Sequence, residues 1–239
     1  LKPFATKTLV ANEAITVSDL EGLSGQNFDG KLLRVHVGYM TSTSPLVYSG
    51  AIQVSIAAPS AANAACPAGT VSGPATAEGA KKLCVLSGNV LSDMHLTSNF
   101  NYVLSGAVFV GGDNINSAEL TIDAGITMFG ESGKDLLVIS RGSKIHVNGS
   151  KEAPVIMTSA NDATADAFTR GQWGGLILNG NAPINGCTVG TATCQASGEG
   201  SSGQFGGNNP ADSSGNLNYL VIKYAGFLTT AENELNGIA

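Results

Sequence analysis

The sequence predicts an all-β protein: a right-handed parallel β-helix, or solenoid, preceded by a small β-rich N-terminal domain or cap. Short apolar strands that end in Gly or Asn recur at uneven intervals of roughly 15–40 residues, as stacked coils require. Glycine is abundant, with 31 of the 239 residues, and only 13% of the residues are charged. That charged fraction is about half the average for soluble proteins, which fits a β-rich extracellular protein.

Residues 1–60 are predicted to form the N-terminal β unit. The segments K-T-L-V-A-N-E-A-I-T-V (7–17), K-L-L-R-V-H-V-G-Y-M (31–40) and G-A-I-Q-V-S-I-A-A (50–58) alternate apolar and polar residues. This period of two is typical of half-buried strands. Residues 61–83 lack hydrophobic periodicity and are interpreted as a loop or linker.

Residues 84–239 are predicted to form the solenoid, which we expect to be incomplete or covered by a partner at its C-terminal end. The separators between its strands are rich in Gly, Asp and Ser, residues that supply tight turns. A meander of antiparallel hairpins would use the same turns, but short apolar strands on three sides favour parallel coils. The best helix candidate is 160–169. The predicted strands cover 102–110, 119–122, 126–129, 136–140, 144–147, 155–158 and 176–178.

The four cysteines fall into two local pairs, Cys66 with Cys84 and Cys187 with Cys194. Their spacing lacks the repeated C-x-x-C of a zinc site. Each pair lies in a long small-residue loop that a disulfide would restrain, so we predict two disulfides and an oxidising compartment. Four reduced, partly buried thiols are the alternative.

The charge pattern argues against nucleic acid as a partner. The formal net charge is −6, and Lys81-Lys82 is the only basic doublet. Binding to phosphates requires clustered Lys and Arg. No stretch is long and apolar enough to predict a transmembrane segment.

Three motifs carry a resemblance to a known family: T-I-D-A-G-I-T-M-F-G-E-S-G (121–133), L-V-I-S-R-G-S-K-I (137–145) and W-G-G-L-I-L-N-G-N-A-P-I-N (173–185). They resemble the β-helix region of secreted and surface-attached proteins, often lipoproteins, of Gram-negative bacteria. The resemblance implies a β-helix fold and an extracellular or outer-surface location. Because that family is mostly uncharacterised, the resemblance supplies no catalytic residues.

No catalytic residue is predicted. Enzymes that act on polysaccharides need paired carboxylates, or a basic group beside a carboxylate, but most acidic residues here lie in turns, where Asp serves as a turn former. Asp162, Asp166 and Arg170 follow helical spacing, for which a solvated cap loop is the simpler interpretation. The histidines His36, His95 and His146 lie far apart in sequence. The groups considered for catalysis are Asp113, Asp123, Glu131, Asp135, Asp162, Asp166, Lys134, Arg141 and Arg170.

Two further positions suggest ligand binding. Trp173 is a candidate carbohydrate contact, although Gly174 and Gly175 favour a ring packed over bare backbone. Asp113 and Asn114 follow two glycines and are weak calcium candidates, because the calcium-binding nonapeptide that they resemble works by tandem repetition. No other cofactor or metal is predicted.

These features lead to two hypotheses for function. The first is an extracellular structural or interaction protein, used for adhesion, a surface layer or a self-assembling fibre. Its partners would be further copies of itself, other surface proteins or a polysaccharide. The second is a carbohydrate-active enzyme or a carbohydrate-binding module that uses the groove of the β-helix.

Overall fold

The computed structural model describes residues 32–41, 44–55, 64–77, 80–166, 168–186, 188, 191 and 194–239. The chain divides into two compact units, residues 1–60 and 61–239, and each unit is considered by itself below. Side chains are described from residue 64 onward.

The first unit contains one described pair of strands. β1 (Leu32–Thr41) and β2 (Ser44–Ser55) are antiparallel, with Leu32 opposite Ser55 and Thr41 opposite Ser44. The predicted strand 31–40 matches β1, and the predicted strand 50–58 overlaps the end of β2. The predicted strand 7–17 lies outside the described residues.

The second unit is almost entirely β-structure. Apart from two short 3-10 helices, its described elements are strands, and most of them pair in parallel. They are β3 (Val71–Ser72), β4 (Lys82–Val90), β5 (Met94–Leu96), β6 (Phe100–Val110), β7 (Glu119–Asp123), β8 (Thr127–Gly130), β9 (Leu136–Ile139), β10 (Lys144–Asn148), β11 (Val155–Ser159), η2 (Asp162–Thr164), β12 (Gly175–Leu178), β13 (Ala196–Ser197), η3 (Glu199–Ser201), β14 (Gln204–Phe205), β15 (Gly215–Asn218), β16 (Leu220–Ile222), β17 (Leu228–Thr230) and β18 (Asn233–Glu234).

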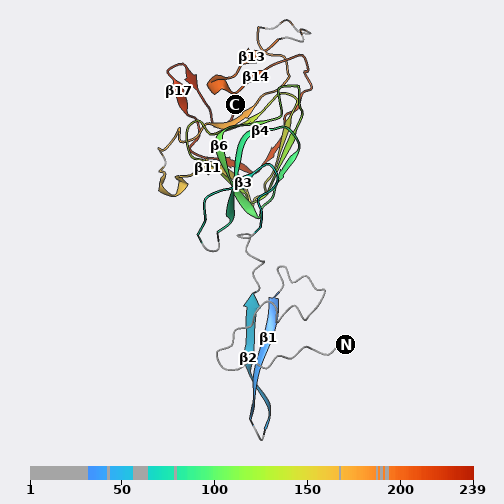
Figure 1. Cartoon of the computed structure of the whole chain (residues 1–239), viewed down its shortest axis with the longest axis vertical. Helices are drawn as coiled ribbons and strands as arrows, with labels where there is room; N and C mark the ends of the chain where they lie inside the picture. Colours follow the sequence, from blue (N-terminus) through green and yellow to red (C-terminus); the bar gives the residue numbers. More distant parts are fainter. Residues whose placement is uncertain are drawn as a thin grey trace. The chain divides into compact units, whose positions relative to one another are not determined.

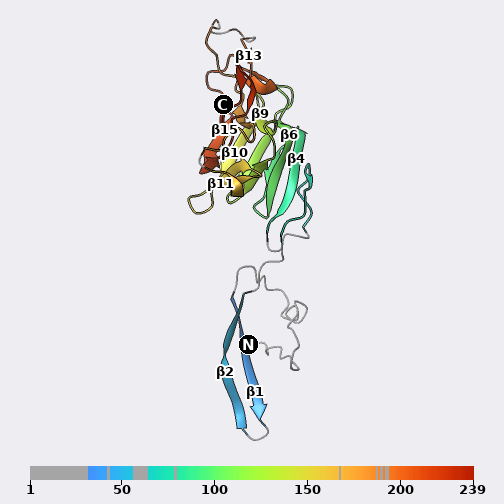
Figure 2. The ribbon, with the colours of Figure 1, turned by 90° about the vertical axis from the view of Figure 1, so that its left-hand side faces the viewer.

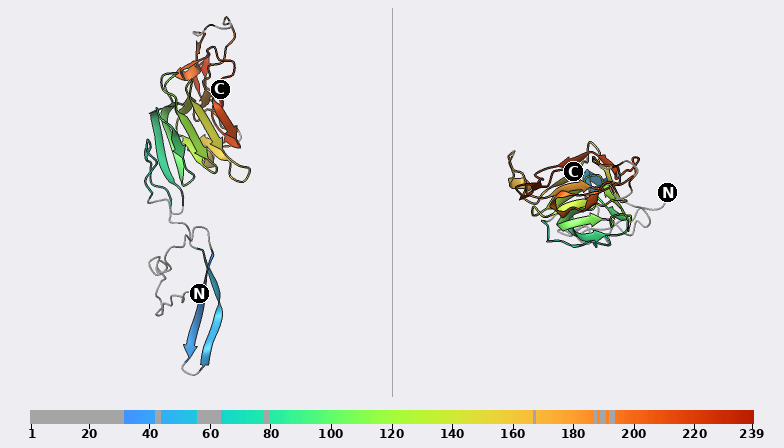
Figure 3. Two further views of the ribbon diagram at one scale, coloured as in Figure 1. Left: turned by 90° about the vertical axis from the view of Figure 1, so that its right-hand side faces the viewer. Right: turned by 90° about the horizontal axis from the view of Figure 1, so that it is seen from above.

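These strands form the stacked coils of a β-helix. As the chain advances it adds strands to a four-stranded sheet, β5-β7-β10-β15, and to an eight-stranded sheet that consists of β3, β4, β6, β8, β9, β11, β12 and β16. Neighbours in the stack are parallel. Figure 3 (left) shows this order as a change of colour from β4 through β6 and β8 to β11 and β16. Antiparallel pairing within this unit is confined to the small pairs β3–β4, β13–β14 and β17–β18, so the described strands are not a hairpin meander.

One long strand is the template for two shorter ones. The first part of β6 pairs with β8, with Tyr102 opposite Met128, and its last part pairs with β9, with Val108 opposite Leu137. The next coil repeats the division, because β11 pairs with β8 and β12 pairs with β9. A corner therefore interrupts the later coils at a place where β6 is continuous.

A buried carboxylate holds this corner. Asp135 is 5% exposed. Its Oδ1 accepts a hydrogen bond from the backbone N–H of Gly106 in β6 (2.7 Å), and its Oδ2 accepts from the N–H groups of Glu131 (2.8 Å) and Ser132 (2.7 Å). The side chain thus joins two consecutive coils. Asp135, one of the carboxylates considered for catalysis, therefore has a structural role in this corner.

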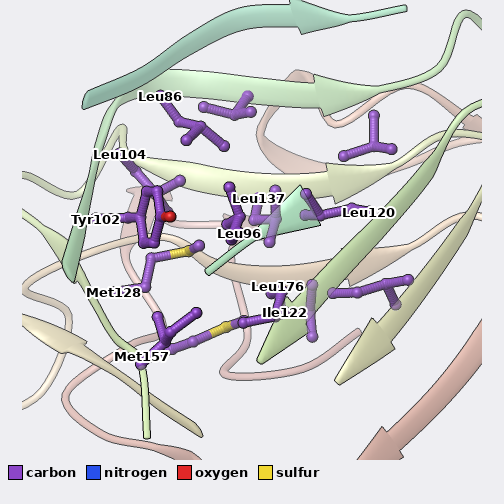
Figure 4. Close-up of a cluster of buried hydrophobic side chains, with 14 of the residues drawn as sticks. Leu86, Leu96, Tyr102, Leu104, Leu120, Ile122, Met128, Leu137, Met157 and Leu176 are labelled. Carbon is purple, nitrogen blue, oxygen red and sulfur yellow. The ribbon is translucent and has the colours of Figure 1, made fainter. Parts of the chain in front are cut away.

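The core is built from columns of side chains stacked from coil to coil. One column runs Cys84, Tyr102, Met128 and Met157, all within 1% of complete burial, and continues to the half-buried Ile222. Figure 4 shows Tyr102, Met128 and Met157 next to one another in the cluster. Because like positions of successive coils lie in register, the period-two pattern of each strand places the apolar residues of all coils in one interior.

The predicted disulfide Cys66–Cys84 is confirmed. It joins the segment before β3 to β4, with the two Cα atoms 5.7 Å apart. The predicted pair Cys187–Cys194 includes Cys187, which lies outside the described residues, so that pairing stays a prediction; Cys194 itself is disulfide-bonded.

We expect the double variant Cys66→Ser/Cys84→Ser to unfold more easily than the wild type. Closing a loop of this length restrains the unfolded chain, and its loss costs about 2–4 kcal/mol. Urea denaturation under oxidising conditions, followed by circular dichroism, measures the difference. An unchanged midpoint would show that the segment around Cys66 adds nothing to the stability of the coils.

The predicted helix at 160–169 is wrong in its length. The described part of this segment contains only η2, a 3-10 helix over Asp162–Thr164. The side chain of Asp162 instead turns to Lys223, whose Nζ lies 2.6 Å from both carboxylate oxygens. Asp162, Asp166 and Arg170 therefore do not share the face of one helix. Among the residues that the structure describes, no helix is long and apolar enough to cross a membrane.

Candidate functional site

The outer surface of the four-stranded sheet gathers polar side chains from coils that are distant in sequence. Along β7 and β10, Leu120, Ile122, Ile145 and Val147 are fully buried, and the residues between them face outward. We call the outward side chains of β5, β7, β10 and β15 the polar face. Figure 2 shows β10 and β15, which pair in parallel, next to each other. The polar face comprises His95, Glu119, Thr121, Asp123, Lys144, His146, Asn148, Asn216 and Asn218.

The central row of the polar face contains two histidines. His95 pairs in register with Thr121, Thr121 with His146, and His146 with Asn216, so that the four residues cross the sheet in one line. His95 is 56% exposed and His146 is 28% exposed at the side chain. The register of the coils thus brings onto one row two histidines, in β5 and β10, that four strands separate in the linear sequence.

Neighbouring side chains fix both imidazoles. His95 Nε2 lies 2.7 Å from Asp123 Oδ1. His146 Nδ1 lies 2.6 Å from Asn216 Oδ1, and its Nε2 lies 3.2 Å from Glu119 Oε2. Each ring therefore has one orientation set by contacts within the sheet. A histidine held by a carboxylate is also the arrangement of a general base.

Apart from its histidines, the polar face carries more acidic than basic side chains. Lys144 Nζ lies 3.7 Å from Glu119 Oε1, whereas Asp123 pairs only with His95 among the described residues. The adjacent Asp93 accepts a hydrogen bond from the backbone N–H of Glu119 (2.9 Å) through Oδ1. Three carboxylates, those of Asp93, Glu119 and Asp123, thus lie close to one lysine and two histidines.

The sequence alone did not identify this row, because the histidines lie far apart along the chain. One signal was available: both follow the same local pattern, an apolar residue on each side, in M-H-L (94–96) and I-H-V (145–147). Aligning the two strings as equivalent strands of different coils would have placed both on one face. The side chain of His36 lies outside the described residues.

The weak calcium candidates Asp113 and Asn114 are both engaged by protein groups. Asp113 Oδ1 accepts from Arg141 Nε (2.5 Å), and its Oδ2 accepts from Arg141 Nη2 (2.9 Å). Asn114 exchanges two side-chain hydrogen bonds with Asn181, at 2.8 and 2.9 Å. A guanidinium therefore occupies the position in which a cation would meet Asp113. Within the described part of the chain no three His, Cys, Asp or Glu side chains converge as metal ligands.

Arg141 is itself buried, with 7% of its surface exposed, and it joins the coil to the long segment after β12. Its Nη1 donates to the carbonyl oxygen of Gly206 (2.8 Å). The hydrogen bond with Asp113 raises the pKa of Arg141, while burial acts in the opposite direction. Arg141, considered for catalysis from the sequence, thus has three structural contacts.

Trp173, the candidate carbohydrate contact, lies in the core. It is 1% exposed, and its Nε1 donates to the carbonyl oxygen of Lys223 (2.7 Å). The Trp173 side chain lies so close to Gly130 that an added Cβ there would be 2.4 Å from the Trp173 Cβ and 2.9 Å from its Cγ. A sugar cannot stack on a ring that the protein covers, because stacking requires an open aromatic face.

The other acidic and basic candidates do not converge on one site. Asp166 receives hydrogen bonds from the Thr169 hydroxyl (2.8 Å) and the Phe168 N–H (2.9 Å), and these bonds lower its pKa. Asp135 and Asp162 have the structural contacts described above. Of the carboxylates considered from the sequence, Asp123 is the one that lies beside a histidine.

The comparisons with known proteins concern the β-helix region. No curated protein and no solved structure matches the chain. A family model described as a pectate-lyase-like β-helix domain matches residues 88–239, which contain β5 to β18 and the whole polar face. The predicted resemblance to a β-helix region is confirmed at this level, and the chain belongs to the pectate-lyase-like β-helix domain family.

Proposed function

We propose that this chain is an extracellular interaction protein that attaches to its partner through the polar face. The observation that carries the proposal is the row from His95 to Asn216, in which side chains from successive coils are already fixed by Asp123, Glu119 and one another. Side chains that are ordered before binding lose little conformational entropy when a partner arrives. The row therefore has the property expected of a recognition surface.

The scaffold supports this use. The strands beneath the polar face stack in register, and their inward residues are fully buried, so the outward groups are spaced by the strand separation of about 4.8 Å. We infer a right-handed coil, because crossovers between parallel strands of one sheet are right-handed in nearly all proteins. Such a scaffold suits adhesion, a surface layer or a fibre, with other surface proteins, copies of this chain or a polysaccharide as the partner.

The proposed location is the outside of a Gram-negative cell. The disulfide Cys66–Cys84 supports an oxidising compartment, since disulfides persist mainly in secreted and surface proteins. The low charged fraction of 13% and the resemblance of the repeated motifs to surface-attached proteins point the same way.

A second candidate function is carbohydrate-active enzyme or carbohydrate-binding module. The specific observation in its favour is the pair His95–Asp123, whose 2.7 Å contact orients the imidazole at an exposed position. A general base positioned in this way could remove a proton from a bound sugar. In this hypothesis Asp123 acts as a positioning residue through the imidazole of His95.

Binding to isolated Gram-negative cell envelopes tests the first proposal. We expect the triple variant His95→Ala/His146→Ala/Asn216→Ala to bind at least tenfold more weakly than the wild type, because it removes three of the four side chains of the row while the apolar core is unchanged. The matched control is Lys134→Ala/Lys151→Ala/Glu152→Ala, which removes three exposed polar side chains outside the polar face.

The outcomes separate the two functions. Equal binding by the triple variant and the control, or no binding by the wild type, overturns attachment through the polar face. Release of new reducing ends or unsaturated products from a polysaccharide panel, lost in Asp123→Asn, would establish the enzyme instead. Light scattering at increasing concentration tells whether the partner is a second copy of the chain.

A further inference from the structure

The side chains of the polar face form a grid of three rows that cross the stacked coils. The central row runs from His95 to Asn216. Strands lie about 4.8 Å apart, and residues two apart along one strand lie about 6.7 Å apart, so every outward group has a fixed place in the grid. The outer rows consist of Glu119 and Lys144 on one side, and of Asp123, Asn148 and Asn218 on the other.

The middle of this grid is open to solvent. The side chains of Glu119 and Lys144 are 49% and 46% exposed, and they lie on β7 and β10, the two inner strands of the four-stranded sheet. The long segment after β12 is attached elsewhere, through hydrogen bonds with Asn114 and Arg141. Figure 1 shows its strands β13 and β14 near the C-terminal end of the chain. A partner can therefore approach Glu119 and Lys144 directly.

The grid is complementary in charge to a second copy of itself. Copies that meet through the same surface are related by a twofold axis, and packed sheets commonly keep their strands aligned within about 30°. An axis parallel to the strands, between β7 and β10, reverses the order of the coils and keeps each row opposite itself. Glu119 of each copy then faces Lys144 of the other. The remaining opposed pairs are Asp123 with Asn148, Thr121 with His146, and His95 with Asn216, none of which joins two carboxylates.

The other aligned arrangement opposes like charges. A twofold axis across the strands keeps the order of the coils and exchanges the two outer rows. Glu119 of each copy then faces Asp123 of the other, while Lys144 faces the neutral Asn148. Like charges that face each other disfavour a complex. The charge pattern therefore selects the axis parallel to the strands.

We propose that the polar face binds the polar face of a second copy of this chain, around a twofold axis parallel to the strands between β7 and β10. This inference rests on the proposed function and names its partner. Within each copy Lys144 Nζ lies 3.7 Å from Glu119 Oε1. Two such pairs face each other across the axis and form a closed network of four alternating charges. A network of this kind contributes more than an isolated surface ion pair.

The contact is small, so the association is weak. Four strands about 4.8 Å apart and about five residues long cover roughly 300 Å² on each copy. The total of about 600 Å² lies below the 1,200 Å² or so of a stable interface, and the charges mainly select the partner and its orientation. We expect a Kd of about 0.1–1 mM. Molecules held on one surface meet at effective concentrations of about this size, so weak pairing suffices for a surface layer.

Sedimentation equilibrium of the full chain measures the association. The wild type should show a monomer–dimer equilibrium. Glu119→Lys and Lys144→Glu should each raise the Kd at least about fivefold, because each substitution places like charges opposite each other at the axis. The double variant Glu119→Lys/Lys144→Glu restores the alternation of charge and should dimerise like the wild type. Thermal denaturation followed by circular dichroism verifies that each variant is folded.

An equimolar mixture of the two single variants tests the arrangement most directly. One copy then offers two lysines and the other offers two glutamates, so both opposed pairs are complementary. The mixed dimer should form at least about tenfold more tightly than either variant alone. The matched control is a mixture of Glu131→Lys and Lys134→Glu, which exchanges two exposed charges outside the polar face and should associate like the wild type.

Three results overturn the inference. They are a wild type that stays monomeric at about 1 mM, a mixture that associates no more tightly than its two components, and stronger association of Glu119→Lys than of the wild type. The last result would indicate the axis across the strands, in which that lysine faces Asp123.

The binding of cell envelopes separates this inference from the proposed function. Envelope binding that the triple variant of the polar face loses, without self-association of the wild type, overturns the second copy as the partner and leaves attachment through the polar face in place. Equal envelope binding by the triple variant and the wild type, together with a monomeric wild type, overturns both.

Discussion

Replacing Trp173 by alanine should destabilise the β-helix by about 3–5 kcal/mol, the range observed for removal of a large buried aromatic side chain. The ring is 1% exposed, and its Nε1 is hydrogen-bonded to the carbonyl oxygen of Lys223. The substitution leaves a cavity between the backbone of Gly130 and the coil that contains Lys223. It also leaves that carbonyl oxygen without its donor, so the losses of packing and of hydrogen bonding add together.

Urea denaturation followed by circular dichroism measures this effect, because Trp173 is the only tryptophan and its removal abolishes that fluorescence. Phe168→Ala is the matched control: this aromatic side chain lies five positions away in sequence and is 87% exposed. Its removal should change the free energy of unfolding by less than about 0.5 kcal/mol. Similar losses in the two variants would mean that Trp173 does not hold the coils together.

Replacing Asp135 by alanine should cost about 3–5 kcal/mol, although the substitution removes few atoms. Hydrogen bonds to a charged group contribute about 1.5–3 kcal/mol each, and unpaired buried donors add a desolvation cost. Asp135→Ala leaves three backbone N–H groups, those of Gly106, Glu131 and Ser132, without their acceptor. The sum of the three is reduced because water can reach part of the opened corner.

The variant Asp135→Asn distinguishes hydrogen bonding from volume. An amide keeps one acceptor oxygen, but its NH₂ group cannot accept a hydrogen bond from an N–H. We expect an intermediate loss, with faster hydrogen exchange at Gly106 or at the pair Glu131 and Ser132, depending on which side the NH₂ faces. Glu131→Gln, a change at an exposed neighbouring carboxylate, is the control and should leave stability nearly unchanged. Equal stability of Asp135→Asn and the wild type would contradict the assigned contacts.

The strands of the β-helix could be predicted from the sequence because each one is a local pattern. The predicted segment 144–147 corresponds to β10 (Lys144–Asn148), and 155–158 corresponds to β11 (Val155–Ser159). The disulfide Cys66–Cys84 could be predicted because both cysteines border one loop. In each case the information lies within a short stretch of chain.

The site could not be predicted in the same way, because it depends on register between coils. The distance along the chain from Thr121 to His146 differs from that between His146 and Asn216, because the long segment after β12, residues 179–214, lies in the second interval. No fixed period relates the three residues. The burial of Trp173 also depends on another coil. The sequence offered its aromatic ring as a possible carbohydrate contact, but the neighbouring coil, which contains Lys223 and Ala225, covers it.

The corner that separates β8 from β9, and β11 from β12, determines where this protein can accept additional residues. Where β6 runs without interruption, the coil beside it bends at residues 131–135, and the following coil departs at the same corner for residues 160–174 before it returns as β12. The paired strands stay in register on both sides of these departures. New chain can therefore be added at the corner without shifting the stack, which makes the corner a natural place for grafting loops onto an unchanged interior.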